Sequence, residues 1–165
     1  MDLIKHTTEW AKGDALQGKI LLFTGLLLII ACFFILKNDN SMLKGSLIPL
    51  ALLLIFCAGY GGFLTFSRPG HIIKTEKIYA ENPQQAVETE LIKAERDNKA
   101  YSMIKKIWPV LIILTAGIYF LVSTDYLKGL MIGLLVLFVA GLVIDTMLHH
   151  RLEPYLKVLR ELSGA

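Results

Sequence analysis

Long apolar runs alternate with polar segments along this chain, and the alternation predicts its elements. The four apolar runs are residues 20–36, 45–66, 107–124 and 129–148. Each run falls in the range of about 17–25 helical residues that cross a bilayer core about 30 Å thick. Inside a bilayer every backbone N–H and C=O must be bonded within its own segment, so the runs are predicted to be helices. The sequence therefore predicts an all-α integral membrane protein with four transmembrane helices.

The polar segments between the runs predict how these helices are joined. Residues 38–41 are a cluster of turn formers, and the third connection is equally short. Residues 67–106 are instead long enough to form helices of their own. We expect a single membrane domain, residues 1–165, in which two helical hairpins are joined by a helical connector.

The connector is predicted to contain two helices. Residues 67–70 include Pro69 and Gly70 and are expected to break the chain before a short helix over 71–80. Asn82 and Pro83 then have the pattern of an N-cap and a first helical position. The helix that follows runs toward Pro109, which either starts the third span or kinks a continuous helix.

One face of this second connector helix is apolar, at Val87, Leu91, Ala94 and Tyr101. Glu90 and Lys93 are predicted to pair at i,i+3 on its solvent side. This apolar face needs another surface to pack against. That surface belongs either to the 71–80 helix or to a second protein, and residues 71–106 are therefore the predicted partner-binding segment.

The two ends of the chain are predicted to be short helices outside the spans. Residues 1–19 are loosely amphipathic, and Trp10 is typical of a helix that lies in the headgroup region. Residues 149–165 carry a narrow stripe of leucines, which predicts a tail helix. An N-terminal segment without membrane contact is the alternative for residues 1–19.

The placement of positive charge predicts the orientation in the membrane. Eight of the seventeen Lys and Arg residues lie within residues 67–106, whereas Lys128 is the only one at the third connection. The positive-inside rule then places the N-terminus, the connector and the C-terminus in the cytoplasm of a bacterial-type inner (plasma) membrane. The formal net charge of +3 is small and gives no indication of nucleic-acid binding.

The two hairpins show a faint duplication. A Leu-Lys-Gly triplet restarts the second span of each hairpin, at residues 43–45 and at residues 127–129. If the similarity is more than chance, the hairpins are parallel repeats about an axis normal to the membrane.

Small residues four apart predict where helices approach closely. Ala58 with Gly62, and Gly129 with Gly133, form two such pairs. Either pair can serve packing within the chain or between copies of a homo-oligomer.

Asp145 is the one ionisable side chain within an apolar run, which makes it a candidate for function. We expect it to act as a latch between the hairpins, with ion coupling as the alternative. The cations predicted to approach the same boundary are Arg68, Lys105 and Lys106.

Asp145 also begins a possible metal site. Asp145, His149 and Glu153 are spaced i, i+4, i+8, so that carboxylate and imidazole ligands share one helical face. The alternative is that all three lie at the membrane boundary, where polar residues belong. Pro154 puts the last step of the series in doubt.

The sequence contains no motif that predicts an enzyme or a resident cofactor. The four histidines all lie at or outside the ends of the spans, which disfavours haem ligation between helices. We therefore expect a non-catalytic scaffold, accessory or immunity-like membrane protein that acts through its cytoplasmic helices. The alternative is a homo-oligomeric small ion channel or transporter.

Overall fold

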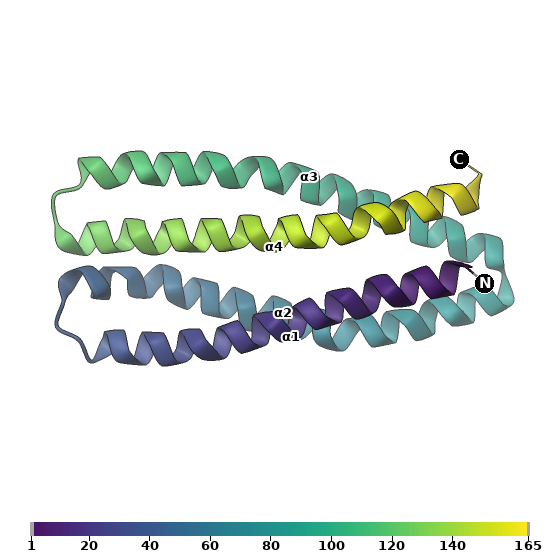
Figure 1. Cartoon of the computed structure of the whole chain (residues 1–165), viewed down its shortest axis with the longest axis horizontal. Coiled ribbons are helices and arrows are strands. Elements are labelled where there is room, and N and C mark those ends of the chain that lie inside the picture. Colours follow the sequence, from purple (N-terminus) through teal and green to yellow (C-terminus); the bar gives the residue numbers. More distant parts are fainter. Residues whose placement is uncertain (1, 165) are drawn as a thin grey trace.

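The computed structural model describes residues 2–164, which form four long helices. They are α1 (Asp2–Leu36), α2 (Ser41–Glu81), α3 (Pro83–Leu121) and α4 (Asp125–Ser163). The start of α1, the end of α4 and the turn between α2 and α3 lie at one end of the molecule, and the two other turns lie at the opposite end (Figure 1). All four helices are long and apolar enough to cross a membrane.

Side-chain caps set the helix starts. Asn40 accepts hydrogen bonds from the backbone N–H groups of Met42 and Leu43, at 2.9 and 3.2 Å. Asn82 caps α3 in the same way, and Pro83 occupies the first turn, where its missing N–H is tolerated. The helix start predicted at Asn82 is confirmed.

The helix break predicted over residues 67–70 is wrong. Helix α2 continues from Ser41 to Glu81 with Pro69 in its interior. Pro69 removes one backbone hydrogen bond, but its neighbour Arg68 and Thr75 further along are buried against other helices. Packing on both sides of the proline holds the helix together. Helices α3 and α4 likewise continue through Pro109 and Pro154.

The separate interfacial helix expected over residues 1–19 is also absent. Helix α1 is continuous from Asp2 to Leu36, and Leu3, Trp10 and Ala11 are buried inside the protein. The same apolar stripe that could lie on a bilayer is covered here by neighbouring helices. Residues 149–163 are likewise the continuation of α4 and not a separate tail helix.

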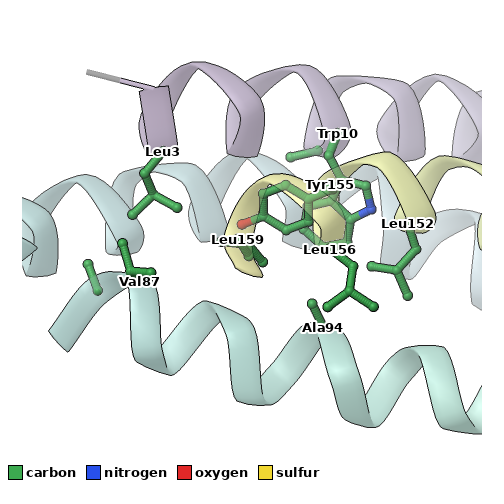
Figure 2. Close-up of a cluster of buried hydrophobic side chains, with 10 residues drawn as sticks. Leu3, Trp10, Val87, Ala94, Leu152, Tyr155, Leu156 and Leu159 are labelled. Atoms are coloured by element: carbon green, nitrogen blue, oxygen red, sulfur yellow. The ribbon is translucent and has the colours of Figure 1, made fainter. Parts of the chain in front are cut away.

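The molecule divides along its length into two parts. We call residues 2–19, 67–106 and 149–163 the polar half, and residues 20–66 and 107–148 the apolar half. In the polar half all four helices surround one core (Figure 2). The buried members of that core are Leu3, Trp10, Ala11, Ala86, Val87, Ala94, Leu152, Tyr155, Leu156 and Leu159.

The apolar half is a row of helices in the order α3, α4, α2, α1 (Figure 1). Helices α2 and α4 form the centre of the row. In an apolar stretch of 18 residues, 28% of the residues are buried in α2 and in α4, against 11% in α1 and 6% in α3. Phe66, Phe120 and Leu121 are about four-fifths exposed. An apolar surface of this extent needs a covering of lipid or of another apolar surface.

Glycines in the two Leu-Lys-Gly triplets make the central contact of this row. A Cβ at Gly45 would collide with the carbonyl oxygen of Tyr126, and a Cβ at Gly129 would collide with that of Met42. Each glycine thus faces the residue three positions before the other glycine. The contact is therefore reciprocal between the two triplets, and the repeat relation of the two hairpins stays a prediction.

Candidate functional site

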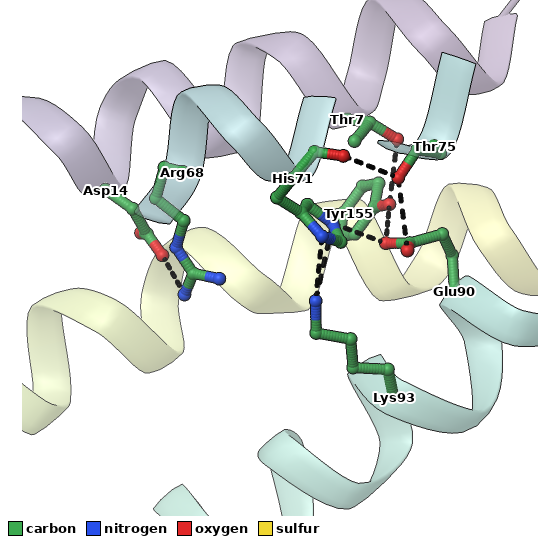
Figure 3. A network of polar contacts seen from close by, with 8 residues as sticks. All are labelled: Thr7, Asp14, Arg68, His71, Thr75, Glu90, Lys93 and Tyr155. Carbon is green, nitrogen blue, oxygen red and sulfur yellow. Dashed lines mark hydrogen bonds and ion pairs between the residues drawn. The ribbon is translucent and has the colours of Figure 1, made fainter. Parts of the chain in front are cut away.

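A buried polar network connects all four helices inside the polar half (Figure 3). Its centre is Glu90 of α3, only 5% exposed. The Oε2 atom of Glu90 lies 2.9 Å from both His71 Nε2 and the Tyr155 hydroxyl, and the Thr75 hydroxyl lies 3.3 Å from Oε1. Thr7 of α1 completes the network at 2.8 Å from the Tyr155 hydroxyl.

The neighbours of His71 define its protonation pattern. Lys93 Nζ lies 2.9 Å from His71 Nδ1, and an ammonium group can only donate. Nδ1 is therefore the acceptor, and Nε2 carries the proton that is donated to Glu90. Because Tyr155 also donates to Glu90, the Thr7 hydroxyl donates to Tyr155. Two chains of donors thus converge on one carboxylate.

The network holds Glu90 in its charged form. Burial disfavours that charge, but the hydrogen bond from His71, the nearby charge of Lys93 and the hydrogen bond from Tyr155 outweigh it. The pKa of Glu90 is therefore lowered. Burial lowers the pKa of Lys93, although the charge of Glu90 partly opposes the shift. Glu90 is a carboxylate at neutral pH.

An aromatic stack joins this network to a buried ion pair. The ring of Trp10 stacks on Tyr155 at 4.9 Å between centroids and 7° between planes. The Arg68 guanidinium lies 4.3 Å from the centroid of the Trp10 ring, and its Nη2 lies 2.7 Å from Asp14 Oδ2. Burial raises the pKa of Asp14 despite the neighbouring Arg68.

A cleft of about 500 Å³ opens beside the network, between α2 and α3. Its cationic lining residues are Arg68, Lys74, Lys93 and Arg96, and Asp97 is its one acid. Two atoms of its lining residues, Arg68 Nε and Ser67 Oγ, are buried without a hydrogen-bond partner. The remaining lining residues are Tyr60, Phe63, Gly70, His71, Ala100, Tyr101 and Ile104.

The cations expected near Asp145 have other neighbours. The Asp145 carboxylate accepts a hydrogen bond of 2.6 Å from the Trp108 indole N–H. Arg68 is paired with Asp14 of α1, Lys105 contacts a histidine, and Lys106 is exposed. Asp145 does connect α4 to α3, but through an indole and not through one of these three cations. Its role as a latch or in ion coupling stays a prediction.

The three candidate metal ligands share one face of α4, as their spacing predicts. However, both ring nitrogens of His149 are engaged: Nδ1 lies 2.8 Å from Lys105 Nζ, and Nε2 lies 2.7 Å from Asn98 Oδ1. Burial and the charge of Lys105 lower the pKa of His149, which favours the neutral ring. Glu153 approaches His149 at 3.7 Å, whereas Asp145 is bonded elsewhere. Residues 2–164 contain no group of three His, Cys, Asp or Glu side chains arranged to hold a metal.

The two predicted small-residue pairs differ in what they contact. Gly129 and Gly133 pack α4 onto α2 within the chain, and a Cβ at Gly133 would lie 3.0 Å from Pro49 Cγ. Ala58 is exposed, and a Cβ at Gly62 would meet no atom within 4 Å. Only the pair on α2 is therefore available to another copy or another protein.

The buried polar network around Glu90 was not among the features predicted from the sequence. The predicted pair of Glu90 and Lys93 on the solvent side is wrong, because Glu90 is buried and its partners come from α2 and α4. One signal was present. Thr7 lies at helical spacing from Leu3 and Trp10, so a polar residue interrupts an apolar stripe, as expected for a buried hydrogen bond.

Comparisons with models of protein families, with curated proteins and with solved structures found no match. The fold and the site define the class of this chain. It is an all-helical protein with four helices suited to crossing a membrane and with a four-helix bundle at one end.

Proposed function

We propose that this chain is a non-catalytic scaffold, accessory or immunity-like protein of a bacterial-type inner membrane. In this proposal the apolar half spans the bilayer, and the polar half forms a cytoplasmic bundle that contains both chain ends. The exposed apolar side chains of residues 20–66 and 107–148 support the insertion. The eight Lys and Arg residues between 67 and 106 support the orientation.

The single observation that carries a non-catalytic role is the closed arrangement around Glu90. Its carboxylate is 5% exposed and accepts hydrogen bonds from two other helices. Donors that stabilise its charge make it a weak proton acceptor. Such a group holds helices together and presents their outer surfaces rigidly, whereas a catalytic base must reach a substrate.

The outer surface of α3 is the best candidate for contact with a partner. Ile92 and Met103 are 63% and 61% exposed, and Lys99 lies between them on the same helical face. Ile73 of α2, within the same 71–106 segment, is 56% exposed. Exposed apolar side chains next to cations suit a protein partner whose surface is apolar and acidic.

Site-specific photo-crosslinking in native membranes tests this proposal. A photoreactive amino acid is placed at Ile92 or Met103, with exposed Lys157 and Glu161 of α4 as matched positions in the same bundle. We expect one protein adduct of defined mass at the α3 positions and none at the α4 positions. Equal labelling at all four positions would contradict a specific partner surface on residues 71–106.

The alternative function, a homo-oligomeric channel or transporter, has one observation in its favour. Ala58 is exposed, a Cβ at Gly62 would meet no atom within 4 Å, and such small-residue pairs mediate close helix association in membranes. Substitution Gly62→Leu would block that association. If the chain is a channel, Gly62→Leu abolishes both the oligomer and ion flux into liposomes, whereas a scaffold keeps its crosslinks at Ile92.

A further inference from the structure

We propose that the cleft between α2 and α3 binds the phosphate-bearing headgroup of an anionic phospholipid. The inference rests on the proposed membrane insertion but not on a protein partner. Lys74, Lys93 and Arg96 are the cations that the phosphate would meet. Three observations support the site: its depth in the molecule, its charge and its volume.

The cleft lies at the level where headgroups are expected. Tyr60 and Phe63, which line one end, belong to the apolar run 45–66, whereas Lys74 and Arg96 line the other end. A ligand in this cleft would therefore contact apolar and cationic groups at opposite ends. That is the distribution of a phospholipid, whose acyl chains begin next to its phosphate. Basic pockets between helices at the cytoplasmic side of a membrane bind such headgroups.

The lining of the cleft has a surplus of positive charge. Arg68, Lys74, Lys93 and Arg96, whose Nε lies 3.7 Å from Asp97 Oδ1, outnumber Asp97 among the lining residues. Behind the lining, Asp14 pairs with Arg68, and Glu90 accepts a hydrogen bond from His71. The exposed Lys74 and the Lys93 ammonium still lack a carboxylate in direct contact, so an anion at this position would be attracted.

Arg68 lies beneath the exposed part of this charged lining. It is only 8% exposed, and its Nη2 is bonded to Asp14. Its Nε and the Ser67 hydroxyl are buried without a hydrogen-bond partner, so a ligand in the cleft would meet the more exposed cations instead of these two atoms. Phosphate oxygens accept hydrogen bonds readily from ammonium and guanidinium groups.

The volume and shape also suit a lipid headgroup. A cleft of about 500 Å³ lies within the range of roughly 300–1,000 Å³ typical of small-molecule sites. Few residues of α2 and α3 touch each other, so the cleft is open along its length between these helices. A lipid can therefore enter sideways from the bilayer. A soluble phosphate compound would leave the aromatic end of the cleft unoccupied.

Native mass spectrometry of the purified protein tests the proposal. The protein is reconstituted into liposomes first, and its resistance to alkaline extraction establishes insertion independently of lipid selectivity. It is then extracted in mild detergent with phosphatidylglycerol and phosphatidylcholine of identical acyl chains in equal amounts. The test variant is Lys74→Gln/Arg96→Gln, and the matched control is Lys77→Gln/Lys99→Gln, which removes the same charge from exposed positions outside the cleft.

We expect the wild-type protein and the control to retain phosphatidylglycerol in preference to phosphatidylcholine. The test variant is expected to lose that preference by roughly tenfold or more, since two cations that attract the anionic headgroup are removed. Equal retention by the two variants would overturn the proposal, because the attraction would then be diffuse. Displacement of the lipid by millimolar inorganic phosphate would also overturn it and would assign a soluble anion to the cleft. Failure to resist alkaline extraction would instead refute the proposed membrane function.

Discussion

The two halves of this molecule hold the same four helices together by different means. In the polar half, side chains from every helix meet around a core and a charged hydrogen-bond network centred on Glu90. In the apolar half, one smaller cluster of buried side chains joins α1, α2 and α4, and close glycine contacts join α2 to α4. The members of that cluster are Leu21, Leu53, Cys57, Leu64, Ile144 and Leu148. The outer helices α1 and α3 leave most of their apolar surface uncovered.

The difference follows from the solvent expected around each half. In water, burial of apolar side chains drives helices together, and a polar group inside the core must find a partner. In lipid, apolar side chains gain little from leaving their surroundings, so close backbone approach becomes the main attraction. Gly129 against Met42 is a contact of that second type, whereas Trp10 stacked on Tyr155 is of the first.

The largest expected effect is that of breaking the network in the polar half. Substitution Glu90→Ala removes the acceptor of His71 and Tyr155 and leaves their buried donors unpaired. We expect the free energy of unfolding to fall by about 4 kcal/mol, as for removal of one member of a buried charged pair. Denaturant unfolding in detergent measures it. Glu88→Ala, at an exposed position of the same helix, is the control and should change stability by less than about 0.5 kcal/mol.

A smaller effect is expected from disturbing the glycine contact in the apolar half. Substitution Gly129→Ala places a Cβ against the Met42 carbonyl, so α4 must move away from α2. We expect a loss of about 2 kcal/mol, typical of overpacking, measured by the same unfolding assay. Gly62→Ala is the matched change, because its Cβ meets open space and alanine favours a helix by about 1 kcal/mol. If Gly129→Ala and Gly62→Ala both lowered or both raised the free energy of unfolding, close glycine contacts would not distinguish the α2–α4 interface from the open surface at Gly62.

The smallest expected effect is the response of the polar half to acid. The folded pKa of Glu90 lies below its ordinary value of 4.5, so its stabilising contribution is complete above that pH. As the pH falls below 4.5 the unfolded chain takes up the proton first, and stability is lost. Asp14 acts in the opposite direction, because its folded pKa is raised and its contribution is lost as pH rises.

The comparison of wild type with Glu90→Gln isolates the contribution of Glu90. Asp14 is present in both proteins, so its effect cancels in the difference of their unfolding free energies. We expect that difference to shrink as the pH falls below the ordinary pKa of 4.5, because the lowered folded pKa keeps Glu90 charged in the native state to a lower pH. A difference that stays constant over this range would contradict a lowered pKa for Glu90.

Local chemistry in the sequence correctly predicted several features. The length and uniform apolarity of the four runs predict four helices able to cross a membrane, because these properties depend on neighbouring residues alone. Asn82 followed by Pro83 predicts the start of α3 for the same reason, since a cap satisfies backbone groups two and three residues away.

Other expectations failed because the decisive contacts come from distant parts of the chain. Pro69 was expected to end a helix, but burial of Arg68 against Asp14 of α1 helps to hold α2 together across it. Residues 1–19 were expected on a membrane surface, because an amphipathic stripe does not specify which apolar surface covers it. The polar half of α4 provides that cover.

Hydrogen bonding and hydropathy over a few turns specify the set of helices and the lengths of their apolar and polar parts. Contacts between distant segments specify that Glu90 is buried, that Gly129 packs within the chain while Gly62 does not, and that Asp145 meets Trp108 and not a cation. The reason is physical: the free energy of a buried charge or of a close backbone approach depends on which distant residue lies opposite it.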